Sequence, residues 1–305
     1  MKIAIFGSGG VGGYFGGRLA ASGEDVTFIA RGAHLAAMQQ DGLHIQSPNG
    51  NAHIHPVKAT DRIESIGQVD VVIFTVKMYD VDAAAATLKP LIGANTVVIT
   101  LQNGVEAVDM VAKHVGADHV AGGTAYIVIV IDKPGHLRHT TNQQIVFGER
   151  DGSRSARLVA FEEACTRAGF QGTVSANIMR DLWIKFVRLS TWSGMTSVTR
   201  SPMGIIRSDQ DLLAMMMAAV DESIAVGRAH GIEFPDTLVA DTRAMIFGLP
   251  PGSKSSMLED LERGRRLELP WLSGAVVRLG KQKGVPTPIH QFITTVLTPL
   301  AQGKS

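Results

Sequence analysis

The sequence predicts an α/β domain with a parallel sheet over residues 1–174, followed by an all-α domain over residues 175–305. Up to about residue 130, short β-branched apolar runs alternate with helix-like segments, which is typical of βαβ units. From about Ala176 onward, long helical patterns continue without strands. A length of 305 residues also exceeds what one hydrophobic core usually fills, so two domains are expected.

Apolar runs and turn signals place the elements of the first domain. Its strands are expected at 2–6, 25–30, 70–76, 96–101 and 119–130. The turn Ser47–Asn51 predicts a small hairpin of 43–46 with 52–57, and a second pair of strands is expected around Lys133–Gly135, ending at Phe147. Helices are expected at 31–40 and 153–168, and the longest helix of the second domain at 209–231.

Composition excludes several classes of function. The net charge is +1 and the sequence shows no basic patch, which argues against binding of nucleic acid. No apolar run reaches the roughly 18 residues of a membrane-spanning helix. The one cysteine, Cys165, falls on the apolar stripe of a predicted helix, where it is expected to pack rather than to react. A lone cysteine and an N-terminus without a signal peptide favour the cytoplasm.

A glycine-rich motif follows the first predicted strand directly and precedes a helix. It is G-x-G-x-x-G, formed by Gly7, Ser8, Gly9, Gly10, Val11 and Gly12. Gly7 permits a tight turn, Gly9 lets the backbone approach a pyrophosphate, and Gly12 lets helix and strand pack closely. The helix N-terminus offers unpaired N–H groups to the anion, so we expect a Rossmann-type dinucleotide site.

The end of the second predicted strand favours NADPH as the cofactor. An acidic residue there would bind the ribose 2′-hydroxyl of NAD, but the sequence reads Phe28-Ile29-Ala30-Arg31. Arg31 is placed to bind a 2′-phosphate, although it is alternatively a solvated residue at a helix start. Lys77 and Asn103 follow later strands and are candidate cofactor contacts, or else loop residues that cap helices.

A single lysine interrupts an apolar helical stripe in the second domain. At helical spacing, Lys185 shares one face with apolar residues, namely Ile178, Leu182, Leu189 and Trp192. Burial would lower the pKa of its ammonium and make it a proton donor near neutral pH. The alternative is that Lys185 extends its charge to the surface over an apolar patch.

Several stretches together resemble the ketopantoate reductase family (2-dehydropantoate 2-reductase), over nearly the whole chain. They are Gly7–Gly12 with Arg31, Leu101–Gly104, Gly148–Glu149, Trp183–Lys185, Ser255–Asp260, Leu267–Glu268 and Gly284–Pro288. The resemblance implies a Rossmann domain joined to an all-α domain like the C-terminal domain of 6-phosphogluconate dehydrogenase. It also implies NADPH as hydride donor, an oxo-acid cleft between the domains, and reduction of 2-dehydropantoate to pantoate in pantothenate biosynthesis.

The same resemblance implies roles for individual residues. Lys185 matches the catalytic lysine, and Glu268 a glutamate near both cofactor and substrate. Asn103 matches an asparagine that contacts both ligands, and Ser256 a serine that binds substrate. Val128 falls where a backbone group approaches the nicotinamide.

Three positions depart from the family pattern. Leu189, Ser193 and Ser253 stand where family members that act on ketopantoate usually carry asparagines. The two serines are still expected to contact the substrate. Because an apolar residue accepts substrates that lack the hydroxyl, we hypothesise a more apolar 2-oxo acid than ketopantoate.

Other functions stay open on the sequence alone. His44, His53 and His55 would share a hairpin face, with His136 and His139 elsewhere, but no further ligands complete a metal shell, so no metal is expected. A protein that senses NADPH without turnover would have no use for Lys185 and Glu268. Imine or opine-type reduction would need an amine cosubstrate. A homodimer is expected from apolar helical faces.

Overall fold

The computed structural model describes residues 1–303, and these form two compact units. The first contains Met1–Gln102 and Glu106–Asp181, and the second contains Asn103–Val105 and the chain from Leu182 onward. The units therefore divide inside helix α6 (Ile178–Thr199), a few residues after the expected boundary at 174. The short segment Asn103–Val105 clusters with the helical unit although its neighbours in sequence belong to the first.

Four parallel strands form the centre of the first unit: β1 (Lys2–Phe6), β2 (Asp25–Ile29), β6 (Val71–Phe74) and β7 (Val97–Thr100). β6 and β7 are buried along their whole length, as expected for strands covered on both faces. β1 lies between β2 and β6, so the strand order reverses there. The sequence-based prediction of these strands is confirmed.

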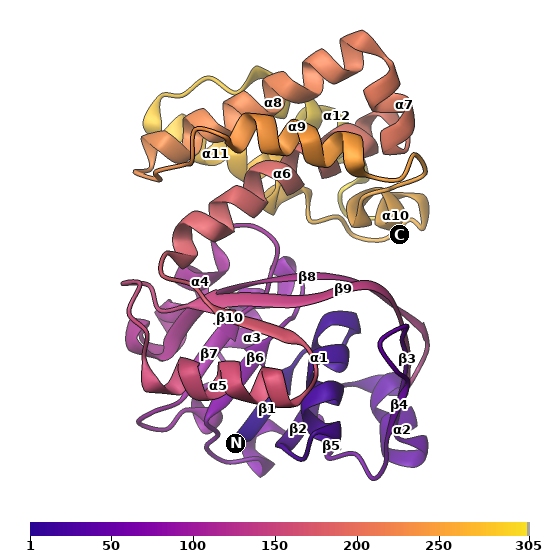
Figure 1. Ribbon diagram of the computed structural model, residues 1–305, viewed down its shortest axis with the longest axis vertical. Coiled ribbons are helices and arrows are strands. Elements are labelled where there is room, and N and C mark those ends of the chain that lie inside the picture. The colour runs from indigo at the N-terminus through magenta and orange to yellow at the C-terminus, as the bar shows by residue number, and fades with distance from the viewer. Residues whose placement is uncertain (304–305) are drawn as a thin grey trace. The chain divides into compact units, whose positions relative to one another are not determined.

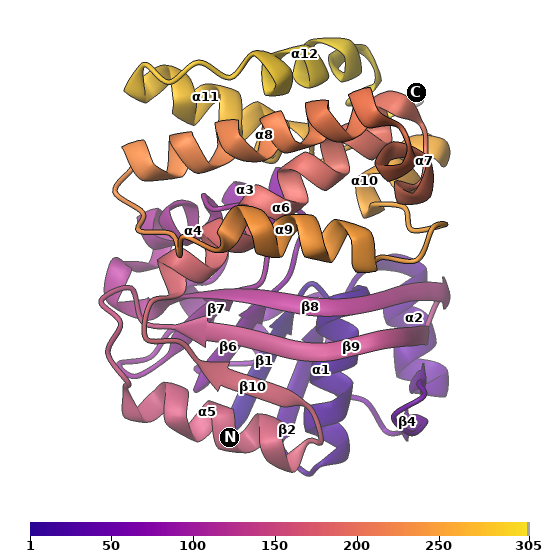
Figure 2. The same cartoon turned by 45° about the horizontal axis from the view of Figure 1, so that its top comes forward.

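A mixed part, with both antiparallel and parallel pairs, extends the same sheet. β8 (Val120–Lys133) pairs with β9 (His136–Gly148), and the hairpin of β3 (Leu43–Gln46) with β4 (Ala52–Ile54) joins β9. With β5 at Ala59–Thr60, the full order is β4-β3-β9-β8-β7-β6-β1-β2-β5, and β10 (Gln171–Val174) lies beside β9. Figure 2 shows β8, β9 and β10 running side by side. Both hairpins were predicted, but β10 and β5 were not.

Helices connect the strands of this unit and cover them. They are α1 (Gly10–Ala21), α2 (Gly32–Asp41), α3 (Val81–Ala85), α4 (Ala107–Val115) and α5 (Ala156–Arg167). α5 lies along β10 (Figures 1 and 2). Cys165 on α5 is fully buried in the core of the unit, as expected, and burial raises the pKa of its thiol well above the usual range.

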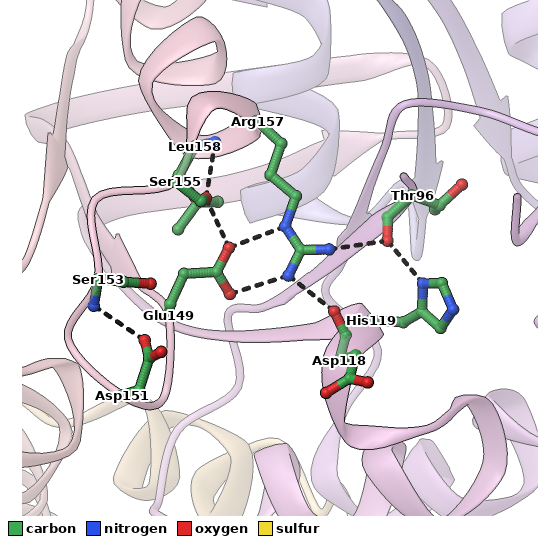
Figure 3. A network of polar contacts seen from close by, with 9 residues as sticks. All are labelled: Thr96, Asp118, His119, Glu149, Asp151, Ser153, Ser155, Arg157 and Leu158. Carbon is green, nitrogen blue, oxygen red and sulfur yellow. Dashed lines mark hydrogen bonds and ion pairs between the residues drawn. The ribbon is translucent and has the colours of Figure 1, made fainter. Parts of the chain in front are cut away.

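A partly buried ion pair connects several chain segments of the first unit (Figure 3). Arg157 on α5 binds both oxygens of Glu149, at 2.8 and 2.9 Å, and Ser155 donates to the same carboxylate at 2.6 Å. The Arg157 guanidinium also donates to the carbonyls of Asp118, at 2.7 Å, and Thr96, at 3.4 Å. Glu149 thus joins the end of β9 to α5, and Arg157 extends the link to the segments before β7 and β8.

The second unit is helical throughout its described residues. After α6 come α7 (Met203–Ser208), α8 (Gln210–Ala229), α9 (Leu238–Gly248), α10 (Ser256–Glu262), α11 (Ser273–Lys283) and α12 (Pro288–Leu297). α6 has 22 residues and α8 has 20, so the expectation that α8 would be the longest was wrong. α8 packs against α11 and α12. Within residues 1–303, no helix is long and apolar enough to cross a membrane.

Candidate functional site

A pocket lies at the carboxyl end of β1, where the strand order reverses. In open parallel sheets this is the position at which ligands bind. Its lining includes the glycine loop and the end of β2, with Gly7, Ser8, Gly9, Arg31, His34, Asp80 and Ile131. The structure therefore brings Gly7–Gly9 of the glycine motif and Arg31 together in one pocket of the first unit.

Close packing explains two of the glycines. Gly7 has a φ of +100°, and a Cβ there would lie 2.8 Å from the Val76 backbone nitrogen. A Cβ on Gly12 would lie 2.4 Å from the Gly7 carbonyl oxygen and 2.5 Å from the Thr75 hydroxyl. Thr75 in turn donates to the Gly7 carbonyl at 2.6 Å and so fixes the loop. Gly9 is different, because nothing lies within 4 Å of its Cβ position.

Ser8 fixes the loop to the neighbouring strand. Its hydroxyl donates to the Ile29 carbonyl at 2.9 Å, and the side chain is almost fully buried. The hydroxyl proton is therefore used in a bond within the protein. Ser8 lines the pocket, and its side chain holds the glycine loop against β2.

Arg31 and His34 lie one helical turn apart at the edge of the pocket, and the sequence-based prediction missed His34. Arg31 is exposed, and its side chain makes no capping bond to α2. The His34 Nδ1 accepts the Gly135 N–H at 3.2 Å, while burial lowers the pKa of His34 against an opposing effect of the Ser8 backbone. A spacing of three on a predicted helix starting at Arg31 was the signal that could have found it.

The other predicted cofactor contacts of the first unit lie in or near this loop. Gly10 and Val11 begin α1, and a Cβ on Gly10 would lie 3.2 Å from the Ile129 side chain of β8. Val128, next to Ile129, is 50% exposed. Lys77 is exposed after β6 and is not part of the pocket lining.

In the helical unit, Lys185 lies on α6 and is partly buried. Burial lowers the pKa of its ammonium to about 8, and the negative charge of Glu268 opposes this fall. The apolar stripe around it includes Leu182, which is 4% exposed. An ammonium with this pKa is a proton donor that can release its proton near neutral pH.

Asn103 and Glu268 meet in the same unit. The Asn103 amide donates to the Glu268 carboxylate at 3.4 Å, and Glu268 is 6% exposed. Gly104 has a φ of +99°, and its Cβ position lies 3.0 Å from the Trp271 carbonyl, so a larger residue would be strained there. Glu268 thus links two predicted site residues, binding Asn103 directly and acting on Lys185 through its charge.

The three predicted substrate serines have different surroundings. Ser193 lies two helical turns after Lys185, fully buried, and its hydroxyl has no hydrogen-bond partner within residues 1–303. Ser253 is partly buried and Ser256 is exposed as the first residue of α10. The sequence-based prediction missed Ser255, which is buried and caps α10 by accepting the Leu258 N–H at 3.1 Å. A serine directly before a helix is the signal for such a cap.

The predicted histidine face forms a stack. The rings of His44 and His53 lie 4.0 Å apart and those of His44 and His136 lie 4.3 Å apart. His139 is separate and buried, with Ser47 at 2.8 Å from its Nδ1. Between residues 1 and 303, no group of three or more His, Cys, Asp or Glu side chains is arranged to hold a metal ion.

Both compact units match models of one protein family. Residues 3–152 match the family model described as ketopantoate reductase PanE/ApbA, and residues 177–301 match its C-terminal counterpart. The chain is 33% identical to a 2-dehydropantoate 2-reductase of Mesorhizobium japonicum, over 99% of this chain and 98% of that protein.

Solved structures share the fold. A PanE/ApbA family ketopantoate reductase from Ralstonia eutropha JMP134 has a TM-score of 0.91 and 30% identity, covering 99% of this chain and 98% of that one. A D-mandelate dehydrogenase bound to NADH and anilino(oxo)acetate shares the fold, with a TM-score of 0.90 and 23% identity over 99% and 98% of the two chains. The chain belongs to the ketopantoate reductase family, whose members are oxidoreductases that act on CH–OH groups with a nicotinamide dinucleotide.

Proposed function

We propose that this protein reduces a 2-oxo acid to the corresponding 2-hydroxy acid with NADPH, and that Lys185 donates the proton. The observation that carries the proposal is the lysine itself: its ammonium is partly buried, has a pKa of about 8 and experiences the charge of Glu268. A protein that only senses a cofactor has no use for such a group. Family membership supports the same class of reaction.

The chemistry of the reduction explains why a lysine is needed. When bound, NADPH supplies a hydride to the carbonyl carbon of the oxo acid. Negative charge then develops on the carbonyl oxygen, where the Lys185 ammonium stabilises it and transfers its proton. Glu268 keeps Lys185 protonated through its charge and orients Asn103 by accepting its amide hydrogen.

Arg31 supports NADPH rather than NADH. The pocket fits a dinucleotide, because Gly7 and Gly12 leave no space for a side chain and Gly9 leaves its backbone open. Arg31 lies at its edge after β2, where no carboxylate is present to bind a ribose 2′-hydroxyl, although Asp80 lines the pocket from the segment after β6. We propose that the guanidinium binds the 2′-phosphate.

Substitution of Arg31 tests the choice of cofactor. Arg31→Ala is expected to raise KM for NADPH by at least about tenfold, because it removes charge-assisted hydrogen bonds, and to leave KM for NADH unchanged. Arg31→Lys keeps the charge but loses the planar guanidinium, which can donate two parallel hydrogen bonds. Its KM for NADPH should lie between those of wild type and Arg31→Ala. Equal KM changes for both cofactors would show that Arg31 has another role.

The family default substrate is 2-dehydropantoate, but Leu189 favours a second candidate, a more apolar 2-oxo acid. Leu189 lies one helical turn after Lys185 and is partly buried. An apolar side chain in this place cannot bind a substrate hydroxyl, so discrimination in favour of ketopantoate would be lost. Ser193 is buried, and its side chain is shorter than that of asparagine, so it should weaken the preference for ketopantoate further.

A substrate panel followed at the NADPH absorbance tests the reaction. We expect turnover of ketopantoate or of branched or aromatic 2-oxo acids, with loss of turnover in Lys185→Ala. Retained NADPH affinity in that variant shows that the fold is intact. A higher kcat/KM for ketopantoate than for the apolar acids would exclude the second candidate, and full activity of Lys185→Ala would exclude the mechanism. Activity that requires an amine would indicate imine or opine-type reduction instead.

We further propose a cytoplasmic location and a homodimer. Cys165 is the only cysteine of the sequence, so no intramolecular disulfide can form, which supports a reducing compartment. Exposed apolar residues on α12, Phe292 at 50% and Val296 at 44%, support association of two copies. Analytical ultracentrifugation of the purified protein tests the second point.

A further inference from the structure

We infer that Thr196 and Ser255 are positioning residues of the oxo-acid site. Their hydroxyl oxygens lie 2.7 Å apart, and both side chains are buried, at 0 and 1% exposure. Thr196 belongs to α6, the helix that carries Lys185, and Ser255 caps α10, whose first residue is Ser256. The inference rests on the proposed function and on the sequence-based expectation that Ser253 and Ser256 contact the oxo acid.

Hydrogen-bond accounting fixes the direction of this link. The Thr196 hydroxyl donates its proton to the Trp192 carbonyl at 2.8 Å, one turn earlier on α6. Because a hydroxyl has one proton, Ser255 is then the donor to Thr196. Ser255 in turn accepts the Leu258 N–H at 3.1 Å. An ordered chain of three hydrogen bonds therefore runs from the first turn of α10 to the backbone of α6.

The segment before α10 is held from a second side. The Met203 N–H donates to the Ser253 carbonyl at 2.9 Å, and the Gly204 N–H donates to the Pro251 carbonyl at 2.8 Å. Gly204 packs so closely that a Cβ would lie 2.7 Å from that oxygen. These backbone bonds hold the loop to α7, while the Thr196–Ser255 bond fixes the start of α10 relative to α6.

The consequence for the site is a fixed spacing between two groups of side chains. Lys185 and Ser193 are carried by α6, and Ser256 is carried by α10. Without the Thr196–Ser255 bond, Ser256 would still be exposed, but its position relative to α6 would be less well defined. Substrate binding should weaken, while proton transfer from Lys185 in the bound complex should continue.

The matched variants are Thr196→Val, Thr196→Ser and Thr199→Val. Thr196→Val keeps the shape and removes two hydrogen bonds, the one to Ser255 and the back-bond to the Trp192 carbonyl, whereas Thr196→Ser keeps both. Thr199→Val is the control, because Thr199 makes the same kind of back-bond, 2.7 Å to the Met195 carbonyl, with no bond to α10. We expect Thr196→Val to raise KM for the oxo acid about tenfold, the effect of losing the buried hydrogen bond to Ser255, with kcat and KM for NADPH within twofold.

Further measurements separate positioning from folding. Hydrogen exchange at the Leu258 amide should be faster in Thr196→Val and normal in Thr196→Ser and Thr199→Val. If Thr196→Val does not fold, Ser255→Gly removes the bond from the other side, and glycine remains an acceptable cap. An unchanged oxo-acid KM in a folded variant without the bond, or an equal change in KM for NADPH, would overturn the inference. Absence of any 2-oxo acid turnover by wild type would instead refute the proposed function, and the inference with it.

Discussion

The Asn103 amide donates a hydrogen bond to the Glu268 carboxylate, at 3.4 Å and across 165 residues of sequence. The same carboxylate raises the pKa of Lys185 against the effect of burial. One acidic side chain therefore controls the orientation of a candidate ligand contact and the charge of the candidate proton donor. Removing its charge should change both.

Activity is expected to fall above pH 8, because Lys185 must be protonated and its pKa is about 8. Glu268 raises that pKa, so Glu268→Gln should lower it and move the falling limb of kcat/KM by about one pH unit towards acid. Profiles of kcat/KM against pH for wild type and the variant measure this shift. If Glu268→Gln lowers kcat/KM but leaves the pH of its alkaline decline unchanged, Glu268 acts only through Asn103.

Two alanine substitutions in the glycine loop should have different effects, one on stability and the other on NADPH binding. Gly12→Ala places a Cβ at 2.4 Å from the Gly7 carbonyl, so we expect the free energy of unfolding to fall by about 2–3 kcal/mol. Gly9→Ala meets nothing within 4 Å, so stability should stay within about 0.5 kcal/mol of wild type. Its methyl group should still weaken NADPH binding at the pyrophosphate. Denaturant titration and NADPH fluorescence test both, and unchanged NADPH affinity in Gly9→Ala would contradict this role.

The Glu149–Arg157 pair is expected to stabilise the first unit without contributing to catalysis. Arg157→Ala leaves the nearly buried Glu149 carboxylate without its main partner, which should cost about 3 kcal/mol of unfolding free energy. Arg154→Ala is the control: Arg154 pairs with Glu162 at 2.6 Å but is 59% exposed, so about 0–1 kcal/mol is expected. Equal losses in the two variants would show that burial does not set the energy of these pairs.

His290 should make the protein less stable in acid. It is fully buried, its Nε2 lies 2.8 Å from the Ser223 hydroxyl, and burial lowers its pKa from 6.5 to about 4. The neutral ring therefore stabilises the fold fully above pH 6.5, and that contribution is lost as the pH falls towards 4. The full loss corresponds to about 3 kcal/mol.

Chemical denaturation across this pH range provides the test. His290→Gln cannot bind a proton, so its stability should fall less steeply with acid than that of wild type. Identical slopes for the two proteins would mean that His290 does not contribute to acid sensitivity.

Local sequence patterns were sufficient for the central strands and the glycine loop. β1 has its predicted bounds, because an apolar run ends directly at Gly7. The edge strands β5 and β10 were missed, since they have two and four residues and are too short to show a period. Gly172 in β10 reads as a breaker, but its lack of a side chain allows close packing on Cys165.

The contacts of the candidate site depend on tertiary structure. Helical spacing alone indicates that Lys185 is unusual, because it interrupts an apolar stripe on one helix. No local pattern relates Asn103 to Glu268, and only the family resemblance assigned both to one site. Ser255 and Ser256 are identical neighbours in sequence, and the cap geometry of α10 decides that the first is buried and the second exposed.

The burial of Cys165 makes the native chain a suitable background for site-specific labelling. It is the only thiol in the sequence, it is fully buried, and its pKa is raised, so maleimide dyes should leave it unmodified. Two cysteines introduced at exposed positions, one in each compact unit, could then carry a fluorescent donor and acceptor. Energy transfer between them would measure whether the distance between the two labels changes when NADPH and an oxo acid are added.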